Sequence, residues 1–206
     1  MQIKTITIFI VVTLGVLLGV GGLLWQFGEA GNKPIEGIAG EMRHKKGAGS
    51  VVITEFSDFQ CPACAAVHQP LQQLLAKYEG KVTFVYRNFP LTSIHKNAMI
   101  AAQAAEAAGL QNKFFEYGDL LFAKQDEWAN LSDPKEAFRA YALLVEIDLE
   151  QFISDMESEE VKNMVAGDLL DSTRYQLKGT PTFFVDGVKV EFGQIEARIQ
   201  ELGARN

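Results

Sequence analysis

The stretch of sequence that decides the fold is Val51-Val52-Ile53-Thr54-Glu55-Phe56-Ser57-Asp58-Phe59-Gln60-Cys61-Pro62-Ala63-Cys64. Its first six residues are β-branched or apolar, apart from one acidic side chain, and they predict a short buried strand. The next four predict a loop. Pro62 favours the first position of a helix, where its missing N–H leaves no hydrogen bond unmade. We therefore expect both cysteines at the point where a strand passes into a helix.

The residues that follow extend this pattern into a β-α-β unit. Apolar residues recur at near-helical spacing over 62–78, and Pro70 within the run is expected to kink the helix. Residues 82–86 are again short, apolar and β-branched or aromatic, and predict a second strand.

The rest of the chain predicts an α/β fold with a helical insertion at about residues 95–177. Asp148 and Ser158 are residue types that favour helix N-caps, and Asp186-Gly187 is typical of a tight hairpin turn. The expected elements are helices over 95–108, 113–123 and 134–145 and from 148 and 158, strands over 182–185 and 188–190, and a terminal helix over 194–202.

The amino-terminal end predicts a single transmembrane anchor over 1–28. From Thr5 to Gly28 there is no charged residue, and at 1.5 Å per residue the run reaches roughly 36 Å, enough to cross a hydrocarbon core of about 30 Å. Lys4 precedes the run, so the rest of the chain is expected on the extracytoplasmic side of the cell membrane. A cleaved signal peptide is the alternative, although its apolar stretch is usually about 7–15 residues.

Residues 29–49 predict a flexible linker, because they contain five glycines, one proline and mixed charges with little apolar periodicity. The folded domain is then expected over 50–206. The chain has 26 acidic against 19 basic residues. This excess of negative charge argues against binding to nucleic acid.

The two cysteines are three positions apart, which suits redox chemistry better than a structural role. A bridge over so short a loop constrains the unfolded chain rather little, and a zinc site would need two more ligands. At a helix start, unpaired N–H groups and the helix dipole favour a thiolate. We assign Cys61 as the sulfur that attacks or is attacked and Cys64 as the resolving sulfur. Bound zinc and an inert disulfide are the alternatives, and we expect no metal and no cofactor.

Two segments, 56–64 and 179–187, together resemble the DsbA-type branch of the thioredoxin superfamily. They are Phe56-Ser57-Asp58-Phe59-Gln60-Cys61-Pro62-Ala63-Cys64 and Gly179-Thr180-Pro181-Thr182-Phe183-Phe184-Val185-Asp186-Gly187. The resemblance covers roughly residues 50–206. It implies a thioredoxin-like fold in which the helical block is an insertion into the core.

The resemblance also implies roles for residues around the cysteines. Pro181 would be a cis-proline beside the pair, and the backbone of Thr180 would contact an extended substrate segment, with Pro62 and Ala63 also at the substrate surface. A plain strand entrance is the alternative for Pro181. Glu55 would lie beneath the pair and exchange protons with the buried cysteine, unless it turns to solvent.

One position departs from the family. The usual basic neighbour on the second strand is replaced by Phe84, which leaves the route of the proton in question. His68 and His95 are interpreted as ordinary polar residues.

These features predict a membrane-anchored protein disulfide oxidoreductase that oxidises the thiols of exported client proteins and is reoxidised by a membrane partner. Between the cysteines, Pro62 matches the first residue of the Pro-His pair found in the oxidising members, and Ala63 replaces their histidine. The extracytoplasmic location favours oxidation. A disulfide reductase or isomerase using the same pair is the nearest alternative. An anchored client-binding protein with incidental cysteines is an alternative from another class.

Overall fold

The computed structural model describes residue 15 and residues 34–203. The transmembrane anchor expected over 1–28 therefore lies outside the described residues, except for one position. Within the part of the chain that the structure describes, no helix combines the length and the apolar character needed to cross a membrane.

The centre of the fold is a five-stranded mixed sheet in the order β1-β3-β2-β4-β5. Strands β2 and β3 run parallel, as a β-α-β unit requires, and the other pairs are antiparallel. Glu55 on β2 pairs with Tyr86 on one side and with Phe183 on the other. The strands are β1 (His44–Gly47), β2 (Val51–Ser57), β3 (Val82–Asn88), β4 (Thr182–Val185) and β5 (Val188–Val190).

The strand β1 corrects the expected linker over 29–49, because residues 44–47 belong to the sheet. It pairs antiparallel with β3 at the sheet edge. Three of its four residues are exposed, and two of those are lysines, which natural sheets place on edges to prevent pairing with other chains. A polar edge strand has no apolar alternation, so the sequence pattern did not indicate it.

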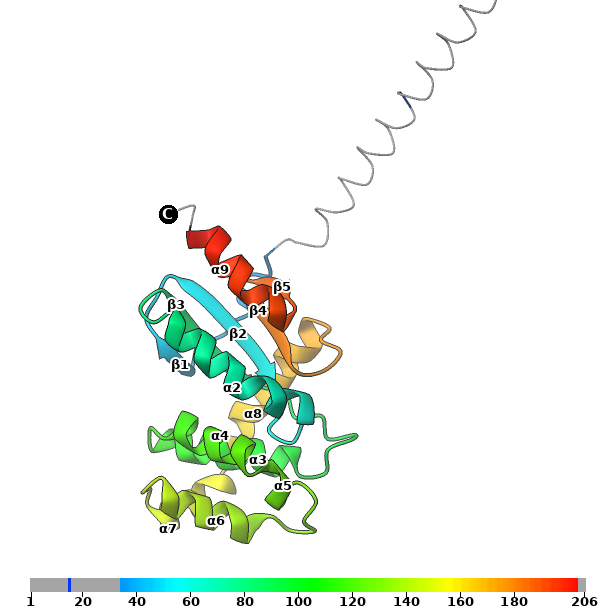
Figure 1. Ribbon diagram of the computed structural model, residues 1–206. Coiled ribbons are helices and arrows are strands. Elements are labelled where there is room, and N and C mark those ends of the chain that lie inside the picture. Colours follow the sequence, from blue (N-terminus) through cyan, green and yellow to red (C-terminus); the bar gives the residue numbers. More distant parts are fainter. Residues whose placement is uncertain (1–14, 16–33, 204–206) are drawn as a thin grey trace, which may run out of the picture. The chain divides into compact units, whose positions relative to one another are not determined.

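Helices cover the sheet on both faces and also form a separate block. Figure 1 shows α2 in front of the sheet, α8 behind it and α3 to α7 gathered below it. Successive side chains of a β-strand point to opposite faces of the sheet. On β3, Tyr86 packs against Phe59 and Phe114 on one face, and the next residue, Arg87, binds Asp168 of α8 on the other. The helices are α2 (Pro62–Lys77), α3 (Ala98–Leu110), α4 (Phe114–Ala123), α5 (Gln125–Trp128), α6 (Lys135–Leu144), α7 (Leu149–Met156), α8 (Glu159–Arg174) and α9 (Ile195–Gly203).

Most of the expected helix boundaries are confirmed, and the differences have local causes. The side chains of Asp148 and Ser158 accept hydrogen bonds from backbone N–H groups at the starts of α7 and α8, as expected for N-caps. Helix α2 continues through Pro70 to Lys77. Helix α3 begins at Ala98 rather than at residue 95. The preceding loop is held instead by hydrogen bonds from His95 to Asp58 and from Asn97 N to Gln60.

The turn between β4 and β5 is also confirmed. Asp186 and Gly187 both have positive φ, 47° and 78°, which is the backbone conformation of the tight hairpin turn predicted from their identity. Asp186 also accepts a hydrogen bond from Val52 N at 2.7 Å, so this turn is tied to the central strand.

A buried polar network joins the sheet to the helical block. Arg87 donates to Asp168 and Asp171 of α8, both at 2.7 Å. Asn88 donates from its backbone to Asp168 and from its side chain to Glu106 of α3, at 2.8 and 2.7 Å. Since buried charges are costly unless paired, these contacts fix the helices to β3 in one arrangement.

Candidate active site

The two cysteines lie where the sequence predicts them, at the junction of β2 and α2. Cys61 is the N-cap of α2 and has extended backbone angles, and Cys64 lies one turn into the helix. Both are free thiols. Cys61 is 6% exposed, whereas Cys64 is fully buried. Pro62 and Ala63 between them are exposed, so a partner can approach the pair from this side.

The environment gives the two thiols opposite acidities. The pKa of Cys61 is lowered to about 5, chiefly by a hydrogen bond from the Cys64 thiol and also by the backbone N–H groups of Cys64 and Ala63, while burial opposes the change. The pKa of Cys64 is raised well above its ordinary value by burial and by the nearby Cys61 and Glu55. At neutral pH the pair therefore holds one thiolate at Cys61 and one thiol at Cys64.

The second motif lies against the first, although 119 positions separate Thr180 from Cys61 in sequence. The Thr180–Pro181 peptide bond is cis, as expected. The carbonyl oxygen of Thr180 lies 3.6 Å from Cys61 Sγ. Thr182 Oγ1 donates to the Gly179 carbonyl at 2.7 Å, which holds the turn before β4.

Glu55 is buried, so it is not a strand-end residue turned to solvent. It is 3% exposed, and its pKa is raised to about 7, chiefly by burial, while His68 lowers it and Cys61 raises it. A carboxyl group with this pKa is protonated about half the time at neutral pH, which suits it to give and accept protons.

His68 has surroundings that the sequence did not indicate. It lies four residues after Cys64 on the same face of α2, and it lines a narrow cavity that is also lined by Glu55, Phe84 and Asp119. Phe84 therefore places a ring at this cavity. Only the tertiary structure brings Glu55, on β2, and Asp119, on α4, to the same cavity as this histidine.

The loop before Cys61 is supported by polar residues that sequence reasoning missed. Asp58 accepts hydrogen bonds from Gln60 N, Leu91 N and His95 Nδ1, at 2.7 to 2.9 Å. Gln125 of α5 donates to the carbonyl groups of Phe59 and Cys61, at 2.7 and 3.1 Å. Asp58 could have been suspected as a turn residue, but nothing near Gln125 in the sequence signals its contact with the loop.

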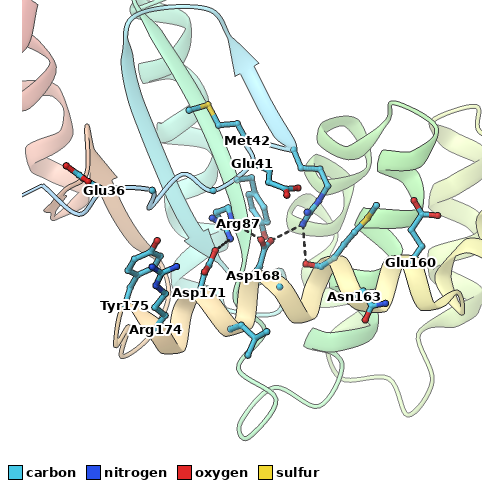
Figure 2. Close-up of a pocket in the computed structure, with 17 residues that line it drawn as sticks. Glu36, Glu41, Met42, Arg87, Glu160, Asn163, Asp168, Asp171, Arg174 and Tyr175 are labelled. Carbon is cyan, nitrogen blue, oxygen red and sulfur yellow. Dashed lines mark hydrogen bonds and ion pairs between the residues drawn. The ribbon is translucent and has the colours of Figure 1, made fainter.

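A larger cavity lies elsewhere and contains none of the predicted site residues. Its volume is about 800 Å³, and it lies between residues 36–43 and α8. Figure 2 shows Arg87, Asp168 and Asp171 in its wall, where Arg87 binds both aspartates. Because these charges are already paired, the cysteine site is the better candidate for chemistry.

Comparisons with known proteins match most of the described domain. The family model described as Thioredoxin matches residues 43–202. A thioredoxin-like oxidoreductase from Silicibacter pomeroyi superposes with a TM-score of 0.68 and 25% identity, over 84% of this chain and 99% of that one. BdbD from Bacillus subtilis gives 0.70 and 20%, over 83% and 96%. The thiol-disulfide exchange protein alpha-DsbA2 from Wolbachia pipientis gives 0.66 and 20%, over 77% and 86%.

Similar curated sequences include much longer proteins named as antiporters. The Na(+)/H(+) antiporter NhaA 3 of Salinispora tropica is 38% identical over 137 residues, which are 66% of this chain and 20% of that protein. The NhaA 1 antiporter of Mycolicibacterium vanbaalenii is 35% identical over 161 residues, 76% and 25% respectively. This chain thus spans a fifth to a quarter of the length of these relatives.

Proposed function

The chain belongs to the thioredoxin family and has the fold of the DsbA-type enzymes, and we propose that it is a thiol-disulfide oxidoreductase that oxidises the cysteines of exported client proteins. The observation that carries the proposal is the pair of opposed acidities at Cys61 and Cys64. A stabilised thiolate beside a buried thiol favours the reduced state of the pair, and this supports a role as an oxidant.

The reaction begins with the Cys61–Cys64 disulfide. A client thiolate attacks Cys61 Sγ, the disulfide breaks, and Cys64 leaves as a thiolate that takes a proton from Glu55. A second client thiolate then attacks the client sulfur of the mixed disulfide, and Cys61 leaves as a stable thiolate. Two client thiols lose two electrons to the pair, which retains one proton at Cys64, and one proton passes to solvent.

The substrate contacts in this proposal come from the surface around Cys61. The exposed Pro62 and Ala63 and the backbone of Thr180, beside Pro181, would face the extended client segment. The carbonyl of Thr180 is already close to Cys61 Sγ, so a client placed along this edge would present its sulfur to the attacking position.

In this proposal the stability of the Cys61 thiolate sets the direction of electron flow. A low pKa at the leaving sulfur favours the reduced state of the pair, and this is what makes DsbA a strong oxidant. The lowered pKa of Cys61 therefore supports oxidation of clients over reduction or isomerisation of their disulfides. A membrane redox partner would return the pair to the disulfide.

The setting of the protein is part of the same proposal. A transmembrane anchor over 1–28 with the domain on the extracytoplasmic side would place Cys61 among exported clients. The similarity to antiporters covers at most a quarter of the proteins named above, and we attribute it to a thioredoxin-like segment in them. Ion transport is not part of the proposal for this chain.

The deciding experiment is the reduction potential of the purified protein, measured against glutathione. We expect a value near the roughly -120 mV of DsbA, and a value near the roughly -270 mV of thioredoxin would overturn the oxidising direction. In cells, Cys64→Ala should trap clients as mixed disulfides at Cys61, and Cys61→Ser should not. An unchanged phenotype for Cys61→Ser would instead indicate a client-binding protein with incidental cysteines.

A further inference from the structure

Glu55 has a proton to exchange but little contact with water. It is 3% exposed and lies on the central strand β2. In the proposed reaction this carboxyl protonates Cys64, and because its pKa is about 7, about half of the molecules at neutral pH must first take up a proton from solvent. Phe84 lines the same cavity as Glu55, and its ring can neither accept nor donate a proton.

One titratable side chain connects the same cavity to the surface. His68 lines the cavity with Glu55, and its Nε2 lies 2.8 Å from Asp119 Oδ1. The side chain of His68 is 19% exposed and that of Asp119 is 48% exposed. Exposure therefore rises in steps from the carboxyl on β2, through the imidazole on α2, to the carboxylate on α4.

The position of the imidazole is held by packing as well as by the aspartate. The His68 ring packs on Phe122 of α4, with 4.6 Å between ring centroids. The cavity has a volume of about 10 Å³, at the lower limit for one water molecule. Tyr86 also lines it, and its buried hydroxyl can bind such a water.

We propose that His68, held by Asp119, is the relay that passes protons between Glu55 and solvent. The inference rests on the proposed function, in which Glu55 needs a proton to give to Cys64. When Cys64 leaves as a thiolate, Glu55 gives up its proton to it. The carboxylate then takes a proton from the imidazole through the cavity, and the imidazole takes one from solvent beside Asp119. His68 acts through Glu55 and does not touch the reacting sulfurs.

The titratable groups around Glu55 all affect the pH dependence of this relay. Phe183, the partner of Glu55 on β4, is not titratable. The titratable groups that face Glu55 are Cys61, Cys64 and His68 from the start of α2, Tyr86 from β3 and, across the cavity, Asp119 from α4. Of these groups, His68 alone both lines the cavity and pairs with the half-exposed Asp119.

The test follows the rate at which the oxidised full-length protein reacts with a cysteine peptide, as a function of pH. In the wild type we expect an inflection near pH 7 that Glu55→Gln removes. His68→Gln should slow the reaction several-fold and move the inflection upward, because the electrostatic effect by which His68 lowers the pKa of Glu55 is lost. Added imidazole should restore part of the rate. Asp119→Asn should act in the same direction, more weakly.

A matched control separates a relay from a structural effect. Gln72 lies on α2 with His68 and also lines this cavity, but its amide does not exchange a proton near neutral pH. Gln72→Ala should leave the inflection in place. If the profile of folded His68→Gln matches that of the wild type, the relay is wrong while the role of Glu55 stands. If Glu55→Gln keeps the inflection, the role of Glu55 in the proposed function fails first.

Discussion

Removing the Cys64 thiol tests the origin of the Cys61 thiolate. The hydrogen bond from Cys64 is the largest cause of the lowered pKa of Cys61. A hydrogen bond to a charged acceptor contributes about 1.5–3 kcal/mol, and one pKa unit corresponds to about 1.4 kcal/mol. Cys64→Ala should therefore raise the pKa of Cys61 by roughly one to two units, from about 5 toward neutral pH.

The assay is the ultraviolet absorbance of the thiolate against pH, checked by the rate of alkylation with iodoacetamide. In Cys64→Ala only Cys61 can contribute, because the chain has two cysteines. Cys64→Ser is the matched control, since its hydroxyl keeps a donor at the same place and should hold the pKa near the wild-type value.

Two results would refute the reasoning. If Cys64→Ala titrates together with Cys64→Ser near pH 5, the neighbouring thiol contributes little and the N–H groups at the start of α2 hold the thiolate. If both variants titrate near the ordinary value of about 8.5, the helix start contributes nothing.

Other predictions concern stability. Asp168→Ala should lower the unfolding free energy by about 3–5 kcal/mol in urea, because it leaves Arg87 buried with one partner fewer; Asp171→Ala, at a more exposed carboxylate, should cost clearly less, and equal losses would contradict the network. Gln125→Ala should cost about 1–3 kcal/mol, because it leaves two carbonyl groups of the cysteine loop without their donor, and faster amide exchange in that loop would support this. The pKa of Cys61 is lowered on folding to about 5. The reduced protein should therefore gain stability relative to Cys61→Ser as pH rises from about 5 to 8.5, and lose that gain as pH falls back to 5. A difference in unfolding free energy that does not change with pH would contradict the lowered pKa.

The sequence alone determined the local structure around the cysteines. Strand β2, the start of α2 and the hairpin at Asp186-Gly187 follow from side-chain period and from turn chemistry, which act over a few residues. The N-caps Asp148 and Ser158 follow from local hydrogen bonding in the same way. Edge strand β1 and helix α5 were missed, since a four-residue polar edge and a four-residue helix carry too little pattern.

The tertiary structure decided which distant residues share the site. The sequence and its resemblance indicated both cysteines, Pro181 and Glu55. Only the fold shows that Glu55 is buried and that His68 and Asp119 meet it at one cavity. Burial and pKa depend on what packs around a side chain from other elements, and no local pattern records that. The chemistry of the cysteine pair was therefore readable from the sequence, whereas the route of its proton required the packing of α2 and α4 against the sheet.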